Sequence, residues 1–332
     1  MDIPANEQSK SDDRRENEIL GIRLFSAAPE GFNPIEATPR ELLAYGYPAR
    51  PDPVLRPRLH KLWTKMMSRP MQIIEPHFAV ITKEARGQRK DYGPPAGNGW
   101  CGSIAFASSA SVGQPNAPAP EAVAFVMGQW IVPHIVGPKP GNCVCACWVG
   151  IDGGGGAENP SNDILQAGTT QAITVNWHGG GDYSSFAWCE WYPADPVAIT
   201  NLAVSPGDTM FCTICASSPT SAVIHLLNVT TGTGTVFIKT APTNVSGQPV
   251  NVQLAGDTAE WIVEAWVDED YDLGRFGDIF FDECIAETRN GYTILGGRGN
   301  LEPMQDVNGN TIAVASTKAD ELILIRYTDP SP

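Results

Sequence analysis

Two short segments place carboxylates beside large aromatic side chains. If residues 143–152 and 187–192 are β-strands, alternate side chains in each point to opposite faces of a sheet. The residues that would share one face are Trp148, Gly150 and Asp152 in the first segment and Trp188, Glu190 and Tyr192 in the second. Glycine at 150 leaves room above the sheet. This face suits a groove for an extended ligand such as a peptide or sugar chain; a polar outer face with a few exposed aromatics is the simpler alternative.

The other face of the first segment carries cysteines at alternate positions. Cys143, Cys145 and Cys147 would lie beside apolar neighbours, so we expect buried free thiols. A zinc site needs converging ligands, usually from two pairs. Cys212 and Cys215 form a Cys-x-x-Cys pair, but the sequence has no second pair of this kind. We therefore expect neither a metal nor any other cofactor.

The common hydrolase signatures are missing. The sequence has no Asp-Thr/Ser-Gly, no Gly-x-Ser-x-Gly and no His-Glu-x-x-His motif. Its histidines, at 60, 77, 134, 178 and 225, have no evident nucleophile beside them. If the protein is an enzyme, carboxylates and amides must carry its chemistry.

The elements that would position these residues are strands. From about residue 98 the pattern has period two, with glycine runs at 153–156 and 179–181 as breaks. Neither run ends in Gly-Lys-Ser/Thr, so a phosphate-binding loop is not expected. We predict an all-β domain over residues 98–332, a two-sheet antiparallel β-sandwich of the concanavalin-like kind.

The N-terminal part differs. Residues 1–32 are polar and predict a disordered tail, and residues 33–97 predict a basic, partly helical extension. Thr38-Pro39-Arg40-Glu41 is a capping box for a short helix that stops at Gly46. Residues 57–68 have apolar side chains at helical spacing and basic ones elsewhere. The extension is either a pro-segment or lid that docks on the acidic domain, or an ordinary helical extension packed by its apolar face.

Charge divides the chain in the same way. Of the 22 Lys and Arg and 37 Asp and Glu residues, 15 and 12 lie in residues 1–90, which leaves 7 and 25 for the remainder, a net charge of −18. An acidic body repels phosphate, so nucleic acid is not an expected partner. It suits work at low pH, although solubility alone also explains it. We find no apolar run long enough to span a membrane, and the N-terminus is too polar for a secretory signal.

Seven blocks then occur in a fixed order. They are Gly-Gln-Trp-Ile-Val-Pro (128–133), Cys-Trp-Val-Gly-Ile-Asp-Gly (147–153), Ile-Leu-Gln-Ala-Gly (164–168), Phe-Ala-Trp-Cys-Glu-Trp-Tyr-Pro (186–193), Ser-Pro-Gly-Asp (205–208), Ala-Glu-Trp-Ile-Val-Glu (259–264) and Phe-Gly-Asp-Ile (276–279). Together they resemble the eqolisin, or glutamic endopeptidase, family over about residues 98–285. The resemblance implies a sandwich of two antiparallel sheets with a substrate groove on one of them.

The resemblance also implies roles. Gln166 matches the catalytic glutamine of that family and Glu264 its catalytic glutamate. Glu264 would activate a water as general base and later protonate the leaving amine, while the amide of Gln166 would hold that water and donate to the oxyanion. The residues that would line the groove are Trp148, Asp152, Trp188, Glu190, Tyr192 and Trp100. Glu190 is the rival for the acid–base role and is interpreted as a supporting residue.

Some features depart from the family pattern. Thr169 and Thr170 follow the glutamine, and Phe186 precedes Ala-Trp, where fungal relatives often carry acidic residues. These differences affect the expected subsite preference and pH optimum more than the catalytic pair. Pro-segments of the family are basic and are removed on activation, which favours the pro-segment interpretation. The family suggests secretion, which this N-terminus does not support.

We therefore expect an acid-acting, monomeric glutamic endopeptidase whose partners are polypeptide substrates. A non-catalytic sugar- or peptide-binding β-sandwich module, with Trp148 and Trp188 as stacking platforms, is the first alternative. A glycosidase with Glu190 and Glu264 as paired carboxylates is the second.

Overall fold

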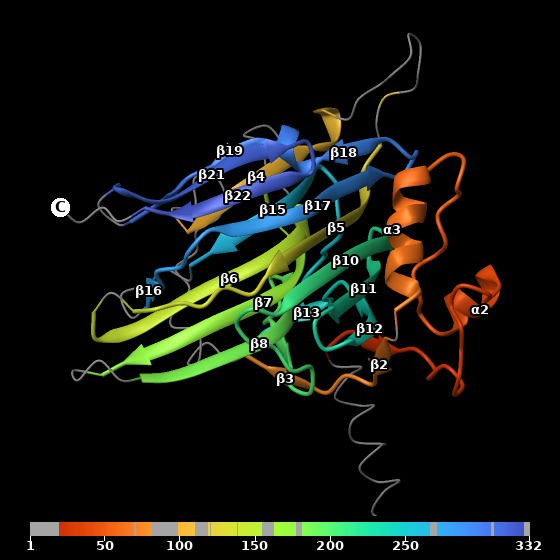
Figure 1. Cartoon of the computed structure of the whole chain (residues 1–332), viewed down its shortest axis with the longest axis horizontal. Helices are drawn as coiled ribbons and strands as arrows, with labels where there is room; N and C mark the ends of the chain where they lie inside the picture. Colours follow the sequence, from red (N-terminus) through yellow and green to blue (C-terminus); the bar gives the residue numbers. More distant parts are fainter. Residues whose placement is uncertain are drawn as a thin grey trace, which may run out of the picture.

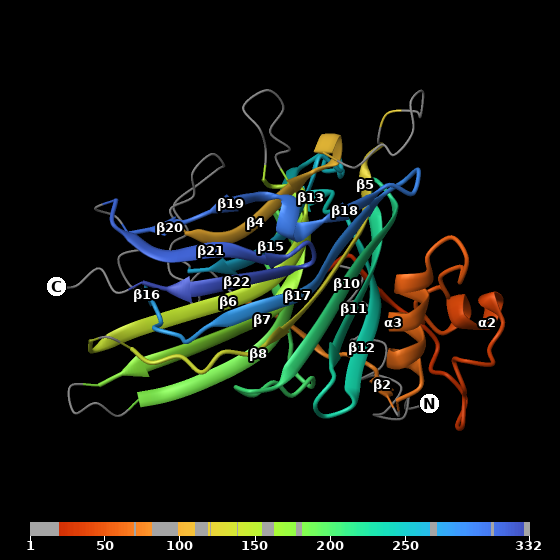
Figure 2. The same ribbon diagram turned by 45° about the horizontal axis from the view of Figure 1, so that its top comes forward.

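The protein is a sandwich of two large sheets, as the sequence predicts (Figures 1 and 2). The computed structural model describes residues 20–69, 71–81, 99–109, 119, 121–137, 139–154, 163–176, 181–265, 271–306 and 309–328. Within these ranges most strand pairs are antiparallel, and β2 with β12 and β16 with β6 are the parallel ones. Figure 2 shows the two sheets as separate layers. No helix in the described parts is long and apolar enough to cross a membrane.

The first sheet carries the strands that the sequence analysis singled out. In the described residues its order is β19 (Asn300–Glu302), β4 (Trp100–Phe106), β15 (Thr258–Glu264), β6 (Gly141–Ile151), β7 (Ile164–Val175), β8 (Gly181–Tyr192), β9 (Val197–Ile199) and β3 (Phe78–Val80), with β16 (Tyr271–Leu273) beside β6. We call it the site sheet, because β6, β7, β8 and β15 hold the residues discussed below.

The second sheet packs against the first. Its order is β1 (Ile22–Leu24), β12 (Thr233–Thr240), β11 (Ser221–Asn228), β10 (Thr209–Ser218), β5 (Val123–Ile131), β17 (Ile279–Thr288), β22 (Leu322–Tyr327), β21 (Thr311–Ala319) and β20 (Met304–Gln305), with β18 (Thr293–Leu295) beside β17 and β2 (Gln72–Ile74) beside β12. The short elements outside the two sheets are the hairpin β13 (Asn244–Val245) with β14 (Gln248–Pro249) and the single 3₁₀ turns η1 (Ala107–Ser109) and η2 (Gly296–Arg298).

The main core lies between the sheets and follows the predicted alternation. Cys145 and Cys147 of β6 face it, beside Val149. These cysteines are free thiols and fully buried, which confirms that prediction. Apolar burial of this extent is the main favourable term in the folding of such a domain.

Residues 20–81, which we call the extension from here on, contribute strands to both sheets. β1 and β2 pair with β12 at one edge of the second sheet, and β3 pairs with β9 at the edge of the site sheet. The structure thus differs from the expected tail over residues 1–32: Ile22–Leu24 form β1, and Ile22 is buried in the main core. The open edge of β12 provides the hydrogen-bonding partner for this segment, which the local sequence does not reveal. Residues 1–19 lie outside the described ranges.

The two helices of the extension agree with the sequence. In α2 (Pro39–Ala44) the Thr38 hydroxyl accepts from the Glu41 amide and the Glu41 side chain accepts from the Thr38 amide. Gly46 follows with a φ of +74°, which favours glycine. The second helix, α3 (Pro57–Met67), begins with proline at its first turn.

Helix α3 docks on the outer face of the second sheet, away from the site sheet (Figures 1 and 2). Leu59, Leu62 and Met66 pack on apolar side chains of β5, β10, β11 and β17. Arg56 forms an ion pair with Glu287 at 2.8 Å, and Arg58 contacts Glu321 at 2.7 Å and Glu283 at 3.2 Å. The apolar packing and the pairing of basic with acidic groups that the sequence suggested occur together.

Two buried polar side chains of the domain have partners in the extension. The Lys239 ammonium donates to the carbonyl of Leu20. His225 Nε2 lies 2.6 Å from the carbonyl oxygen of Gly46, and its Nδ1 lies 2.8 Å from Thr213 Oγ1. A carbonyl can only accept, so Nε2 carries the proton and Nδ1 accepts from the hydroxyl.

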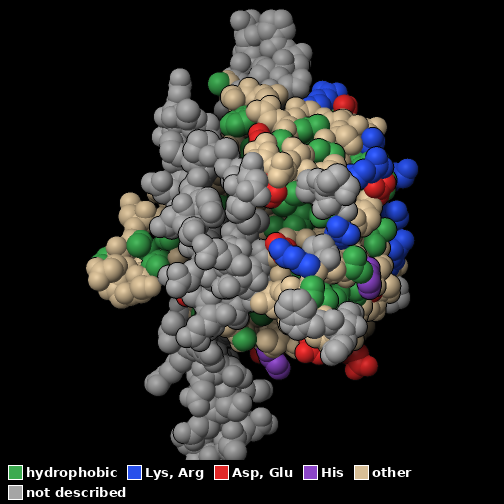
Figure 3. All heavy atoms as spheres, turned by 90° about the vertical axis from the view of Figure 1, so that its left-hand side faces the viewer, with side chains coloured by type: hydrophobic (Ala, Val, Ile, Leu, Met, Phe, Trp, Pro, Cys, Tyr) green, Lys and Arg blue, Asp and Glu red, His purple; other side chains and the backbone are tan. Residues whose placement is uncertain are grey.

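Charges of both signs lie on the face at the left of Figure 1, where basic side chains gather along one side with apolar ones among them (Figure 3). Lys139 pairs with Asp272 at 3.0 Å, and Arg326 pairs with Asp278 at 2.8 Å. Exposed pairs of this kind contribute at most about 1 kcal/mol each, so they add little to the stability of the domain.

His225 makes the fold less stable in acid. Burial lowers the pKa of His225 from 6.5 to about 4. Between these values the unfolded chain takes up a proton that the folded chain does not, so this stability is present above pH 6.5 and is lost as the pH falls toward 4. The loss is about 3 kcal/mol at most.

We predict that His225→Gln, which is neutral at every pH, flattens the dependence of the unfolding free energy on pH between 7 and 4. Urea denaturation at a series of pH values measures it. The exposed histidine variant His134→Gln is the control and should follow the wild type. Parallel curves for wild type and His225→Gln would contradict the prediction.

Candidate active site

A second apolar cluster covers the face of the site sheet that points away from the main core. We call it the groove-face cluster, and its buried members are Ile81, Ile104, Ala146, Trp148, Ile164, Trp188 and Ile262. Trp100 and Tyr192 are partly buried at its margin. The structure therefore brings Trp148, Trp188 and Tyr192 to one face, as the alternation indicated, and Trp100 lies beside them.

Four residues lie side by side across the strands of this face. Glu260 of β15 is opposite Gly150 of β6, Gly150 is opposite Gln166 of β7, and Gln166 is opposite Glu190 of β8. Opposite residues on neighbouring strands point to the same side of a sheet. This row therefore holds one amide between two carboxylates. The room above its glycine, which the sequence suggested would be open, is taken up by the Trp148 ring and the Glu260 carboxyl.

Gln166 is buried, with 1% of its surface exposed. Its Nε2 donates to Oε2 of Glu190 at 2.6 Å. Its Oε1 is buried and has no hydrogen-bond partner among the described residues. An unsatisfied buried amide oxygen is costly unless a ligand or water completes it, so this atom marks a place where a polar group is expected.

Glu264 is held by a tryptophan. The indole N–H of Trp148 donates to Glu264 Oε2 at 2.9 Å, and the Trp148 ring meets that of Trp100 edge to face at 4.9 Å. Glu264 lies opposite Trp100 in β4 and Ala146 in β6. With 8% of its surface exposed, it is a nearly buried carboxylate with a fixed orientation.

Trp148 contacts Glu264 and reaches over Gly150, the residue opposite Gln166. The edge of its ring bearing Nε1 contacts Glu264, while Cζ3 lies 3.0 Å from where a Cβ on Gly150 would be, next to Gln166. Opposite Trp148 in β7 stands Gly168, where a Cβ would come within 2.1 Å of the Cys147 carbonyl oxygen. A side chain at 150 would crowd the indole, and a side chain at 168 would collide with the Cys147 carbonyl and with Cβ of Trp148.

Asp152 lies at the end of β6. It follows β6 with a φ of 68°, and its carboxylate accepts from the Gly256 amide at 3.0 Å and the Asp257 amide at 2.7 Å. Burial raises its pKa, although these hydrogen bonds act in the opposite direction. The charge of Asp152 acts on Glu260 and Asp163, and its place in the groove stays a prediction. Its contacts are those of a residue that fixes the turn at 256–257.

Two further carboxyls were missed. Glu260 is completely buried, and neither Thr258 nor the Gly154 amide makes a well-oriented hydrogen bond to it. Burial raises the pKa of Glu260 well above its usual range, and the charge of Asp152 acts in the same direction. Asp163 accepts from the Trp191 indole at 3.0 Å, and burial raises its pKa to about 6. Alternation along Ala-Glu-Trp-Ile-Val-Glu could have found Glu260, because it shares a face with Glu264.

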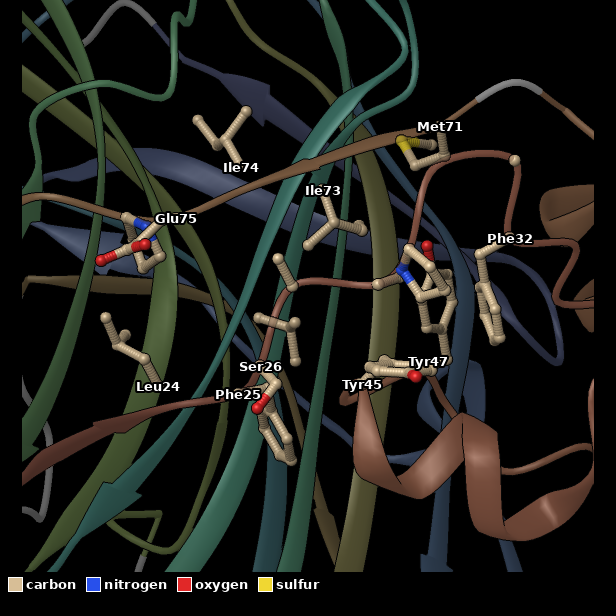
Figure 4. A pocket seen from close by; sticks show the side chains of 16 residues that line it. Leu24, Phe25, Ser26, Phe32, Tyr45, Tyr47, Met71, Ile73, Ile74 and Glu75 are labelled. Atoms are coloured by element: carbon tan, nitrogen blue, oxygen red, sulfur yellow. The ribbon is translucent and has the colours of Figure 1, made fainter.

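Two features lie outside this face. A pocket of about 250 Å³ opens within the extension, where Phe32, Tyr45 and Tyr47 lie beside Met71 (Figure 4); it contains none of the residues of the predicted site. Among the described residues no group of three or more His, Cys, Asp or Glu side chains could hold a metal ion.

The fold and the site together define a β-sandwich whose outer sheet face holds a carboxylate and an amide beside buried tryptophans. The family model of the peptidase A4 family matches residues 109–327, which is more than half of the chain. The protein belongs to the peptidase A4 family. The resemblance to the eqolisins is thereby confirmed.

Two curated relatives agree with this assignment. Aspergillopepsin-2 of Aspergillus niger is 29% identical over 181 residues, which is 54% of this chain and 58% of that protein. Scytalidopepsin B of Scytalidium lignicola is 38% identical over 85 residues, 26% of this chain and 28% of that protein. The matched part of the chain thus spans less than two thirds of the length of either relative.

Solved structures show the same fold. A crystal structure of scytalido-glutamic peptidase with a transition state analog inhibitor has a TM-score of 0.52 and 21% identity, and covers 69% of this chain and 98% of that one. A second one, with a peptide-based transition state analog, has a TM-score of 0.51 and 22% identity over the same shares. The predicted sandwich fold is confirmed.

The pH dependence of stability tests whether the buried Glu260 carboxyl is protonated in the folded protein. Because its folded pKa is raised, its contribution favours the folded state below the usual glutamate pKa and is lost as the pH rises. We predict that Glu260→Gln gains stability relative to the wild type between pH 4 and 7. Thermal unfolding at both pH values measures it, with the exposed residue variant Glu36→Gln as the control. A constant difference between Glu260→Gln and wild type at the two pH values would show that the carboxyl is not held protonated.

Proposed function

We propose that the protein is an acid-acting glutamic endopeptidase in which Gln166 and Glu264 activate a water molecule against a peptide bond. The observation that carries this proposal is the placement of the two residues on one buried sheet face, where Trp148 bonds to Glu264 and reaches over Gly150, the residue opposite Gln166. Family membership supports peptide hydrolysis as the reaction. The assignment of the two side chains rests on the resemblance of their sequence blocks to the family, and their placement on one sheet face supports it.

The reaction follows from the chemistry of the two groups. Ionised Glu264 takes a proton from the water while the water oxygen attacks the carbonyl carbon of the peptide bond. The carbonyl oxygen becomes an oxyanion, which the amide N–H of Gln166 stabilises. As the C–N bond breaks, protonated Glu264 gives its proton to the departing amine and returns to its starting state. The Trp148 N–H holds the carboxylate oxygen in place through this cycle.

The substrate in this proposal is an extended polypeptide. Trp100 and Tyr192, partly exposed at the margin of the groove-face cluster, supply apolar contact area with polar edges. Trp148 and Trp188 are buried in the same cluster. Glu190 acts through Gln166. Asp152 contributes indirectly, by fixing the turn at 256–257. Secretion and a monomeric state remain predictions from the sequence.

The extension is proposed to be a pro-segment. It reaches the site sheet at Ile81, which is buried in the groove-face cluster and donates its amide to the Pro196 carbonyl at 2.9 Å. The part of residues 33–97 that follows, 82–97, lies outside the described ranges. A lid formed by α3 finds no support, because α3 packs on the opposite sheet.

We predict that Glu264→Gln lowers casein cleavage near pH 3–4 by about 10²–10⁴-fold, since it removes the base. Gln166→Glu should lower cleavage by about 10²–10³-fold, since it removes the oxyanion donor. Glu260→Gln is the matched control for the first variant, because it makes the same change on the same face of the same strand, and it should keep its activity. Circular dichroism checks that each variant folds.

Full activity in Glu264→Gln or Gln166→Glu would contradict the mechanism. Absence of cleavage at any pH in the wild type, together with binding on a glycan array, would instead support the non-catalytic module. Activity lost in Glu190→Gln and Glu264→Gln alike, on an oligosaccharide and not on casein, would support the glycosidase.

The pro-segment has its own test. We predict that acidification of the purified protein releases a fragment that ends near residues 90–98, and that activity appears with the same time course. Intact-mass spectrometry identifies the cut. The Glu264→Gln variant, treated in parallel, distinguishes self-cleavage from a contaminating protease. Full activity of the uncut chain would contradict the pro-segment and would favour an ordinary extension.

A further inference from the structure

The Gln166 amide has two ends with different partners. Its N–H₂ end donates to Glu190, and its oxygen end has no partner among the described residues. An ionised carboxylate can only accept hydrogen bonds, so it holds the N–H₂ end toward itself. A protonated carboxyl group can donate, and it can then bind the oxygen end instead.

We propose that protonation of Glu190 turns the Gln166 amide over, so that Nε2 faces the reacting peptide, and that this step sets the upper pH limit of activity. The link to activity rests on the proposed peptidase function. The turn of the amide does not depend on it. Glu190 is in this view a positioning residue, because it acts through Gln166.

A general base alone does not explain an acid optimum. Once Glu264 is ionised, a rate that depends on it alone stays high as the pH rises. Loss of activity toward neutral pH therefore requires a second group that must carry a proton. Glu264 cannot be that group, since it must be ionised in order to act.

The orientation of the Gln166 amide explains why a second group must carry a proton. With Glu190 ionised, Nε2 is engaged in a charge-assisted hydrogen bond of 2.6 Å, and it is the oxygen of Gln166 that remains without a partner. A carbonyl oxygen cannot stabilise an oxyanion, because both carry negative charge. With Glu190 protonated, the carboxyl donates to Oε1, and Nε2 becomes the free donor that the oxyanion needs.

The turn costs little in packing. The oxygen and the N–H₂ group of an amide are nearly the same size, so a rotation by half a turn leaves the volume of the side chain unchanged. Gly150 lies opposite Gln166 on the other side and presents no side chain. No neighbouring side chain has to move.

Other titratable groups lie near this pair and define the rival explanations. Lys239 of β12 is within electrostatic reach of Glu190, and so is Cys189 of β8, whose pKa burial raises to about 12. Glu260 lies in the same row beyond Gly150, and Glu264 is held by Trp148. Asp163, with a pKa of about 6, is the group whose ordinary titration could also produce an upper limit.

The first measurement is the pH dependence of kcat/KM on a peptide substrate for wild type, Glu190→Gln and Asp163→Asn. The amide introduced by Glu190→Gln stays neutral and can donate to Oε1 at every pH, so the upper limb should move to higher pH. At two pH units above the wild-type midpoint, wild type should fall to about one hundredth of its maximum, while Glu190→Gln keeps most of its own. Asp163→Asn should keep the wild-type limb. The proposal would be overturned if the fall in kcat/KM at high pH came at the same pH in Glu190→Gln as in the wild type. It would also be overturned if that fall moved in Asp163→Asn instead.

The second measurement needs no activity. The side-chain ¹⁵N–¹H₂ signals of Gln166, assigned by their loss in Gln166→Leu, are followed against pH in the wild type. They should shift with the midpoint of the upper limb, and stay constant in Glu190→Gln. A constant signal in the wild type would overturn the switch even if Glu264→Gln abolishes cleavage, and the proposed function would then stand alone. A signal that titrates in a protein that cleaves no peptide would refute the function and keep the switch.

Discussion

Strand β6 is buried on both faces, and the rest of the molecule depends on this constraint. From Cys143 to Ile151 each of its residues is buried. One face supplies thiols and aliphatic groups to the main core, and the other supplies Trp148 and Gly150 to the site. A slip of one residue in its pairing would exchange the two sets. Trp148 would then enter the core between the sheets, and a cysteine would face Glu264.

The extension places a second constraint on the domain. His225 and Lys239 are buried in the second sheet, and they bond to carbonyl groups of Gly46 and Leu20. A buried polar group that loses its partner costs about 1–3 kcal/mol. Acid has two opposite effects on the contact between the extension and the second sheet. It disfavours neutral His225. Burial raises the pKa values of Glu283 and Glu287 although Arg58 and Arg56 lower them, so protonation of these glutamates favours the folded state but removes their attraction to α3. The docking of α3 therefore does not depend on its ion pairs alone.

Much of the site follows from the sequence, and the exceptions have physical causes. Alternation placed Trp148, Trp188, Glu190 and Tyr192 on one face. In a strand that is buried on both sides, successive side chains point strictly to opposite faces. At Asp152 a positive φ marks the end of β6. Strands β1, β2 and β3 are three residues each, too short for any period, and their partners β12 and β9 lie far along the chain. Gln166 and Glu264 were found through family resemblance, since neither their type nor their spacing distinguishes them from other polar residues on a sheet.

An amide in place of a second carboxylate changes how such a site responds to acid. Two facing carboxylates share a proton, and their combined charge follows the pH directly. An amide has no charge to lose and offers both a donor and an acceptor at every pH. What varies is which end faces the reaction, and that depends on its neighbour. In this protein the neighbour is Glu190, on the adjacent strand and 2.6 Å away. The chemistry of Gln166 is therefore controlled by a residue that need not touch the substrate.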